Sequence, residues 1–517
     1  MRTLEMKRTH LITGIFVAVF ALLLSVNDVF AQSTSVSISN SNGVSRYQMK
    51  NGRQKLNIEY DGKIVFADDD KSIKSISRGG YLLVRKTSFG QRREILAEAN
   101  SDNTVSYEYR VGRRVQEWNQ EAEEFLAEII LEVIRSTGIG AEGRVERFYK
   151  AGGVDGVLQE IEEIRSDHVK HIYLQVLLDE QELNDQELAK VAAFVPRELD
   201  SDHYITEVFK DHAELFLTND ETTNAFLNAI GRMDSDHYIT VILTRALRED
   251  LDDEALIKVI DAADVMDSDH YKTNVLKEVL DRRDLSDQLV DAVIKASSDI
   301  DSDHYATIVI SDALDRPNLS DEAFENLMDA VSNIDSDHYV TQSFLSMLHD
   351  KEVSDKVVAA IISRLEYMDS DHYRTVVINE LFDDHEISEE YWGSLLNTID
   401  DVDSDHYATQ MLAHVLENDL TDEQYAQVLR KISNIDSDHY KVNILKELMD
   451  ADLEEEQLKA LLEVADSIDS DYYKSEVLRS ACSEVRNSTD QVKDLYRKVA
   501  KGIRSDTYYG RVARCID

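Results

Sequence analysis

The residues of this 517-residue chain that could do chemistry recur in one short motif, Asp-Ser-Asp-His-Tyr. Within five positions the motif holds two carboxylates, a hydroxyl, an imidazole and a phenol. Its Ser-Asp pair occurs eleven times, at steps of 33 to 35 residues, and the serines are Ser166, Ser201, Ser235, Ser268, Ser302, Ser336, Ser370, Ser404, Ser437, Ser470 and Ser505. So regular a spacing indicates that each copy belongs to one repeating structural unit.

Metal binding is the first chemistry that the motif suggests, because carboxylates and imidazoles are ligands of zinc and other divalent cations. No copy has the spacing of a calcium loop, and each offers too few ligands unless adjacent units share an ion. A divalent-metal-binding or metal-stabilised repeat protein is therefore the alternative hypothesis, and otherwise no cofactor is predicted. Its candidate ligands are Asp236, His237, Asp269, His270, Asp303, His304, Asp337, His338, Asp371, His372, Asp405 and His406.

The preferred hypothesis is that the motif is structural. A serine side chain at a helix start caps a free backbone amide, and carboxylates beside it are stabilised by the positive helix end. The tyrosine would pack in the seam between units, and the histidine would bond a carboxylate or carbonyl of the neighbouring unit. The residues given this role are Ser201, Tyr204, Ser235, Tyr238, Ser268, Tyr271, Ser302, Tyr305, Ser336, Tyr339, Ser370, Tyr373, Ser404, Tyr407, Ser437 and Tyr440.

Repetition itself argues against catalysis, because an active site depends on a unique arrangement of residues. The sequence also contains no GxSxG nucleophile motif and no phosphate-binding glycine loop. No catalytic residue is predicted, and we expect a protein that is not an enzyme.

Two amphipathic helices in each unit would position the motif. Apolar residues follow Ser268 at helical spacing, and a second helix begins at capping residues such as Asn184 and Thr421. One hairpin cannot bury its apolar face, whereas stacked hairpins form a continuous core. The predicted fold is mainly α: an α-solenoid of about eleven hairpins over residues 153–517, with a C-terminal cap at about 471–517.

The repeat length alone does not name a repeat family. A period near 34 residues matches the tetratricopeptide repeat, but the tryptophan, glycine and proline signature of that family is missing. HEAT repeats are usually longer and often contain proline. Neither family is assigned.

The residues before the array differ in kind. A basic start, the apolar run Leu11–Val26 and a following Val-Phe-Ala predict a signal peptide at residues 1–31. The Ser/Asn-rich segment 32–43 is expected to be a flexible leader. Hairpin-turn signals predict a small antiparallel β domain of five or six strands at 44–118, and 119–152 is expected to be a helical bridge.

The two cysteines, Cys482 and Cys515, follow the serines of their motifs by 12 and 10 residues. These positions are close to equivalent on neighbouring helices, and an export compartment is oxidising. One possible outcome is therefore a disulfide that links two helices of the C-terminal cap. The other is that the two cysteines do not pair, because the offset of two residues could misalign their side chains.

The repeats, and the preceding segment KSIKSISRGGYL…GIGAEGRVERFYKAGGVDGVLQEIEEIRSDH, resemble a group of largely uncharacterised bacterial exported proteins. Similar repeats are attached to membrane zinc peptidases of the penicillin-sensor type. The peptidase part is missing here, since the chain has no HExxH motif and no bundle of membrane helices. The resemblance implies an exported accessory or sensory module, in the bacterial periplasm or outside the cell.

The charge of the chain is concentrated in the array. The whole chain has a net charge of −46, whereas residues 151–470 alone carry 24 basic and 76 acidic residues, a net of −52. Such acidity argues against nucleic acid as a partner, and no stable membrane insertion is expected after signal cleavage. The predicted function is an exported, non-enzymatic binding scaffold that recognises a protein or peptide, including a cationic one. Part of the acidity follows from the motif itself, which places aspartates on both sides of one serine.

Overall fold

The structure is a computed structural model that describes residues 34–41, 43–102, 104–282, 285–314, 316, 319–348, 355–384, 387–418, 420–449 and 453–515. The predicted signal peptide, 1–31, lies outside the described residues. Within them, an antiparallel β domain is followed by 25 α-helices in tandem, so the predicted α-solenoid with a small β domain before it is confirmed. The chain divides into two compact units between Glu249 and Asp250, and each is described by itself.

The β domain contains nine strands in the described part of the chain. They are β1 (Thr34–Ser41), β2 (Val44–Asn51), β3 (Gln54–Asp61), β4 (Ile64–Phe66), β5 (Ile73–Ile76), β6 (Tyr81–Ser88), β7 (Gln91–Ala99), β8 (Val105–Val111) and β9 (Arg114–Gln116). Seven form one antiparallel sheet in the order β1-β2-β3-β6-β7-β8-β9, while β4 and β5 form a separate hairpin. The main sheet is therefore a meander, in which successive connections alternate between its two ends.

Two expectations about this region are wrong. Residues 34–41 of the segment expected to be a flexible leader form strand β1, which pairs with β2 along its whole length, from Thr34 opposite Asn51 to Ser41 opposite Val44. Its Ser/Asn-rich composition concealed the alternation Val36-Ser-Ile38, which is typical of a strand. The domain also has more strands than five or six, because β1, β5 and β9 are short or polar and carry a weak sequence signal.

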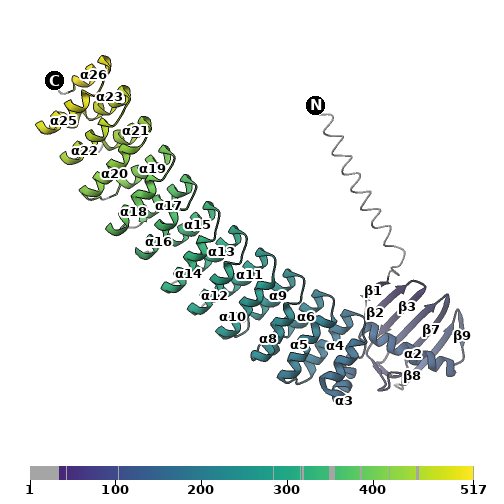
Figure 1. Cartoon of the computed structure of the whole chain (residues 1–517). Helices are drawn as coiled ribbons and strands as arrows, with labels where there is room; N and C mark the ends of the chain where they lie inside the picture. Colours follow the sequence, from purple (N-terminus) through teal and green to yellow (C-terminus); the bar gives the residue numbers. More distant parts are fainter. Residues whose placement is uncertain are drawn as a thin grey trace, which may run out of the picture. The chain divides into compact units, whose positions relative to one another are not determined.

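Helix α2 (Gln120–Thr137) covers one face of the sheet (Figure 1). The side chain of Asn119 accepts a hydrogen bond from the Ala122 amide at its start, and Gly138 ends it with a φ of 75°. Its Phe125 and Ile129 are buried with strand residues such as Ile58 in one apolar core. This face of the sheet is therefore the inner face.

The first compact unit continues into helical hairpins. Its remaining helices are α3 (Ala141–Glu162), α4 (Asp167–Glu180), α5 (Asp185–Glu198), α6 (Asp202–Asp211), α7 (Ala213–Phe216), α8 (Asp220–Ile230) and α9 (Asp236–Ala246). Helix α3 kinks at Gly153, where φ is 62° and ψ is −154°. The predicted start of the array at residue 153 falls on this kink.

The second compact unit is built from helices in two layers (Figure 1). One layer contains the helices that follow the motif: α11 (Asp269–Leu280), α13 (Asp303–Leu314), α15 (Asp337–Leu348), α17 (Asp371–Asp384), α19 (Asp405–Leu416), α21 (Asp438–Met449), α23 (Asp471–Ser480) and α26 (Asp506–Ala513). The other contains α10 (Asp253–Ala262), α12 (Asp287–Ser297), α14 (Asp321–Ser332), α16 (Asp355–Leu365), α18 (Glu389–Asp400), α20 (Asp422–Asn434), α22 (Glu455–Asp466) and α25 (Asp490–Ala500). The short helix α24 (Cys482–Asn487) precedes α25.

Apolar side chains fill the space between the layers. In α11, Val275, Leu276 and Val279 are fully buried, at the helical spacing expected after Ser268. None of the described helices combines the length and the apolar character needed to cross a bilayer.

Candidate functional site: a row of motif residues along the array

In nine motifs of the described chain, the second aspartate binds the backbone of the following repeat. This aspartate is the first residue of its helix, and its Oδ2 accepts a hydrogen bond from the backbone N–H of the next motif serine. In the first compact unit, Asp167 accepts from Ser201 and Asp202 from Ser235, both at 2.9 Å. In the second, seven such bonds measure 2.6–3.0 Å and join Asp269 to Ser302, Asp303 to Ser336, Asp337 to Ser370, Asp371 to Ser404, Asp405 to Ser437, Asp438 to Ser470 and Asp471 to Ser505. Neighbouring repeats are therefore joined by a charge-assisted hydrogen bond.

The motif serine is not the side-chain cap that we expected. At Ser201, Ser235, Ser268 and Ser404 the serine occupies the N-cap position, but its hydroxyl makes no capping bond. At Ser370 and Ser470 the hydroxyl accepts from the amide three residues on, at a long 3.5 Å. The motif serines have ψ near 110°, whereas true caps such as Thr421 have ψ near 160°. The backbone amide of the serine, rather than its hydroxyl, makes the repeated contact.

The other helix of the hairpin does begin with side-chain caps. Asn184 and Thr421 form the predicted capping boxes with Glu187 and Gln424. Ser320 also accepts a hydrogen bond from the amide of Ala323, at 3.1 Å. In these repeats the helix of the other layer is started by a side-chain cap, whereas the motif helix is not.

Rings of the motif form a continuous row in the second compact unit. From His270 to His439, each histidine ring lies 4.9–5.3 Å from the tyrosine that follows it in sequence. The same ring lies 5.5–6.0 Å from the motif tyrosine of the next repeat. The first compact unit has the same arrangement, with His203 at 5.0 Å from Tyr204 and 6.2 Å from Tyr238.

This row lies at the surface, which corrects two expectations. The motif histidines from His203 to His439 are exposed and the tyrosines are half-buried, so the tyrosines are not core residues. The core position is the residue after the tyrosine, for example Ile205 or Val340. The histidines were expected to bond a carboxylate or carbonyl, but His270 and His338 contact amide side chains of their own helices, Asn274 and Gln342, at 3.3 Å.

The candidate metal ligands do not converge. Among the described residues, no group of three His, Cys, Asp or Glu side chains could hold a metal ion. The aspartates from Asp269 to Asp405 in the ligand set accept hydrogen bonds from serine amides, and the rings of the histidines beside them lie tilted against tyrosine rings. The geometry gives the metal hypothesis no support.

Buried cations are residues that the sequence reasoning missed. Five repeats place a basic residue directly after the motif tyrosine or its equivalent, and all five are at most 9% exposed: Lys170, Lys272, Arg374, Lys441 and Lys474. Lys441 and Lys474 donate to the carbonyl oxygens of Ser433 and Asp466, at 3.1 and 3.0 Å, near the end of the preceding helix. A cation in this place is stabilised by the helix dipole. The signal was a basic residue at a position that is apolar in other repeats.

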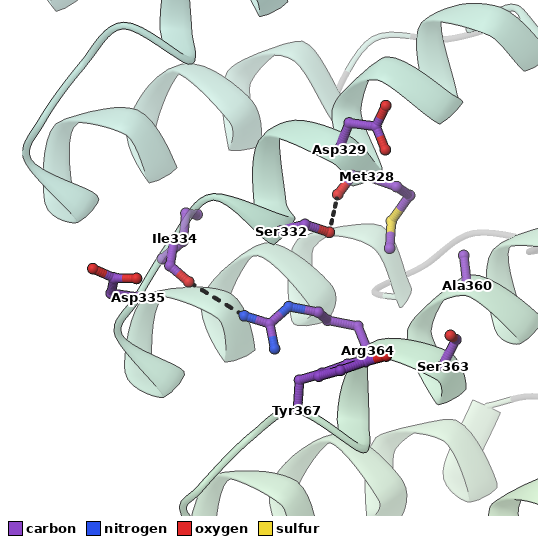
Figure 2. Close-up of a pocket in the computed structure, with 9 residues that line it drawn as sticks. All are labelled: Met328, Asp329, Ser332, Ile334, Asp335, Ala360, Ser363, Arg364 and Tyr367. Carbon is purple, nitrogen blue, oxygen red and sulfur yellow. Dashed lines mark hydrogen bonds between the residues drawn. The ribbon is translucent and has the colours of Figure 1, made fainter.

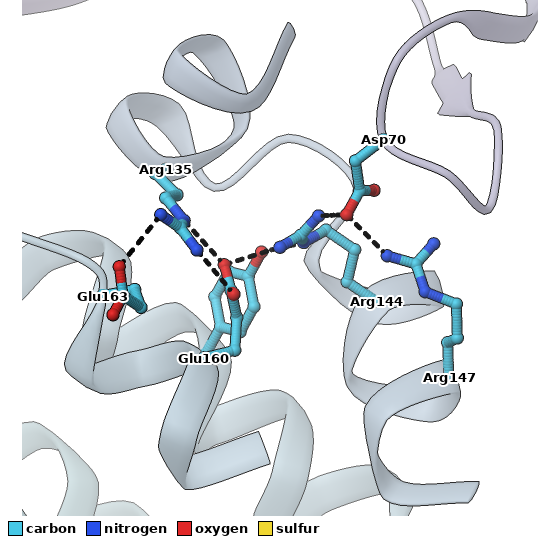
Figure 3. A network of polar contacts seen from close by, with 7 residues as sticks. Asp70, Arg135, Arg144, Arg147, Glu160 and Glu163 are labelled. Atoms are coloured by element: carbon cyan, nitrogen blue, oxygen red, sulfur yellow. Dashed lines mark hydrogen bonds and ion pairs between the residues drawn. The ribbon is translucent and has the colours of Figure 1, made fainter. Parts of the chain in front are cut away.

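A buried polar network joins the β domain to the first hairpins (Figure 3). Arg144, only 3% exposed, donates to Asp70, to Glu160 at 2.5 Å and to the Tyr173 hydroxyl at 2.9 Å. Arg135 donates twice to Glu160, at 2.9 Å. Burial raises the pKa of Tyr173 to about 12. Asp70, Arg144 and Arg147 of this network also line a hollow of about 430 Å³. The network holds the β domain and the first hairpins together.

A hollow of about 590 Å³ lies between α14 and α16, at the loop that leads into the motif helix α15 (Figure 2). Two carboxylates line it, Asp329 and the motif residue Asp335, together with the exposed ring of Tyr367. Arg364 donates to the carbonyl oxygen of Ile334 at 3.3 Å. The hollow is therefore a polar recess that one residue of the motif, Asp335, helps to line.

The C-terminal cap contains a disulfide. Cys482 and Cys515 are bonded, with their Cα atoms 5.6 Å apart. The offset of two residues is absorbed because Cys482 begins α24 and Cys515 follows α26.

No protein-family model matches the chain, and neither does any curated protein sequence. Among solved structures, the chain is similar to the pentatricopeptide repeat protein PPR10 in complex with an 18-nt psaJ RNA element, at 14% identity and a TM-score of 0.21. The match covers 77% of this chain and 66% of the other, so the chain spans just under two thirds of that protein. A computationally designed self-assembling cyclic homooligomer matches at 11% identity and a TM-score of 0.10, covering 68% of this chain and 98% of the other.

These matches correct one expectation about partners. The acidity of the array argues against nucleic acid as a partner, yet the matched pentatricopeptide repeat protein is bound to RNA. The exclusion of nucleic acid is therefore withdrawn. At identities and TM-scores this low, the matches indicate no ligand for this chain.

Proposed function

We propose that this chain is an exported, non-enzymatic scaffold whose helical array binds an extended, cationic segment of a protein or peptide partner in the bacterial cell envelope. The observation that carries the proposal is the row of exposed histidines and half-buried tyrosines along the motif helices. Export rests on the signal-like sequence of residues 1–31, and the bacterial envelope rests on the resemblance of the repeats to exported proteins.

Each repeat offers the same chemistry to a lysine or arginine. A tyrosine face attracts a cation by about 0.5–1 kcal/mol at an exposed site. The first aspartate of the motif is exposed beside it, as at Asp301, Asp335 and Asp369, and none of these three forms an ion pair among the described residues. One repeat therefore gives a weak contact, and several in series give useful affinity.

The spacing of the repeats suits an extended chain. Packed helices lie about 8–10 Å apart, and a peptide in the extended polyproline II conformation advances about 3.1 Å per residue with three residues per turn, so that every third side chain lies on one face. A cationic side chain at every third residue would therefore meet successive repeats. The hollow with Asp329, Asp335 and Tyr367 adds a recess into which one such side chain fits.

A peptide-binding assay tests this proposal. Fluorescence anisotropy of the chain from Gln32 onward would compare a labelled peptide with lysine at every third residue, a peptide of equal composition with clustered lysines, and a glutamate version. We expect the spaced peptide to bind most tightly and the glutamate version not to bind. Equal binding of the spaced and clustered peptides would contradict recognition by repeat spacing.

Matched variants locate the binding surface. Asp335→Asn with Asp369→Asn removes two carboxylates beside the row, while Glu322→Gln with Glu390→Gln removes two exposed carboxylates from α14 and α18 in the other layer. The first pair should weaken binding of the spaced peptide at least fivefold, and the second less than twofold. If both pairs weaken binding equally, the general negative field, and not the row, attracts the peptide.

A further inference from the structure

One end of the main β sheet is basic. The turns β2–β3, β6–β7 and β8–β9 lie at this end, because connections alternate along the meander. Five exposed cations lie on or beside these turns: Lys50, Arg53, Lys55, Arg113 and Arg114. None of the five has an ion pair in the part of the chain that the structure describes.

Elsewhere in the domain, cations lie close to acidic residues. The opposite end of the sheet carries the acidic residues Asp61, Asp68, Asp69 and Asp102 in its connections. Cations in the middle of the sheet are paired, as Arg85 is with Glu94 at 2.6 Å. At the acidic end, Lys71, Lys74 and Arg78 are also exposed without an ion pair among the described residues, but aspartates share their connection. The three turns at the basic end carry cations and no acidic residue, in a chain whose net charge is −46.

An exposed phenylalanine lies among these cations. Phe89 forms the tip of the β6–β7 turn, where its side chain is 78% exposed. Its φ of 49° lies in the left-handed region, which favours glycine or asparagine over a bulky residue. Neither burial nor backbone preference explains a phenylalanine here, and strained, exposed residues of this kind cluster at binding sites.

The chain also enters the domain at this end. Thr34, the first residue of β1, lies opposite Asn51 in the β2–β3 turn. Seven residues, 27–33, separate it from the apolar sequence Leu11–Val26. So short a connection spans at most about 28 Å when extended. While the leader is attached and held in a membrane, the basic end is thus within reach of that membrane.

We propose that this basic end, defined by Lys50, Arg53, Lys55, Phe89, Arg113 and Arg114, docks on the surface of a bilayer that contains anionic phospholipids. The cations face the headgroup phosphates, and the Phe89 ring enters the boundary between headgroups and acyl chains. A lipid surface fits better than a soluble polyanion, because a polyanion offers the exposed ring no apolar phase. The attachment is peripheral and leaves the acidic array free for its own partner.

Vesicle co-sedimentation tests the proposal with the chain from Gln32 onward. We expect binding to vesicles of phosphatidylcholine with phosphatidylglycerol, loss of binding at high salt, and no binding to phosphatidylcholine alone. Each lysine or arginine near an anionic surface strengthens binding about fivefold. Arg113→Glu with Arg114→Glu should therefore weaken binding at least about 25-fold. Phe89→Asn, which suits the left-handed turn, should weaken it about fivefold to tenfold.

The control is a charge reversal of equal size at the other end of the domain. Lys74→Glu with Arg78→Glu changes two exposed cations away from the basic end and should leave vesicle binding within twofold of wild type. Circular dichroism verifies that each variant is folded. Equal loss in both double variants, or equal binding to neutral vesicles, overturns the proposal.

Two further outcomes name other occupants and also overturn it. Heparin is the soluble polyanion probe. Tight heparin binding that needs Arg113 and Arg114 but not Phe89, without vesicle binding, assigns the basic end to a soluble polyanion. A salt-sensitive oligomer that Arg113→Glu with Arg114→Glu dissolves, again without vesicle binding, assigns it to the acidic array of a second copy.

Discussion

The bond between repeats makes a sharp prediction at Asp371. Its Oδ2 accepts the backbone N–H of Ser404 at 3.0 Å, while Asp369, two residues earlier in the same motif, is exposed. The two aspartates share the motif and the charge. Asp371→Ala should therefore destabilise the array far more than Asp369→Ala.

The magnitude follows from what each change removes. A hydrogen bond to a charged group contributes about 1.5–3 kcal/mol, and a carboxylate at a helix start adds about 0.3–1 kcal/mol. Since Asp371 is half-buried, we expect Asp371→Ala to lower the free energy of unfolding by about 2 kcal/mol. Asp371→Asn keeps an acceptor and should cost about 1 kcal/mol. Asp369→Ala should change it by less than about 0.5 kcal/mol.

Urea denaturation followed by circular dichroism measures the four proteins, with Ser404→Ala as a further control. The Ser404 hydroxyl makes no capping bond, so its loss should cost less than about 0.5 kcal/mol. The stability of a repeat array is the sum of the stabilities of its repeats and of the interfaces between neighbours, so one interface can weaken without the rest. Hydrogen exchange at the Ser404 amide therefore measures this interface directly. If Asp371→Ala and Asp369→Ala unfold within about 0.5 kcal/mol of each other, the bond does not hold the repeats together.

Three further predictions concern the cap, the N-terminal network and export. Cys482→Ala with Cys515→Ala should destabilise the C-terminal cap by about 3–4 kcal/mol, because the disulfide closes a loop of 33 residues. Scanning calorimetry with and without reductant measures the change, and an unchanged melting temperature would contradict the prediction. Because the pKa of Tyr173 is raised to about 12, above the value near 10 of an unfolded tyrosine, its contribution is complete below pH 10 and is lost as the pH rises towards 12. Urea denaturation across this range should show a slope that Tyr173→Phe flattens; an identical slope in the variant refutes the assignment. Mass spectrometry of the exported protein should find an N-terminus at Gln32, and an intact Met1 would refute signal cleavage.

The array was predictable because the motif and the apolar residues after it recur in each repeat. One hairpin has an ambiguous apolar pattern, but eleven copies at 33 to 35 residues leave one architecture, stacked hairpins. The caps at Asn184 and Thr421 were predictable for a local reason, since both partners lie within four residues. The β domain was recognised where turns flank apolar strands, and β1 was missed because its alternation is carried by serines.

The contacts of the motif could not be derived in the same way. The aspartate that joins two repeats bonds a backbone amide 32 to 34 residues away. Because nearly every residue has a backbone amide, the residue type does not reveal which one is the partner. Both aspartates of the motif therefore looked equivalent. The row of rings was also hidden, because periodicity gives the face of a residue but not the distance to the next repeat.

The bond from Asp371 to Ser404 and its equivalents has a direction, since each repeat supplies the acceptor and its successor supplies the donor. Any repeat can therefore follow any other without leaving an unmatched group. Duplicating or deleting one whole period would create a junction chemically identical to those already present, whereas a change of a few residues would not. The array can thus become longer or shorter by whole repeats, through duplication or deletion in its gene, while the interfaces between repeats stay the same.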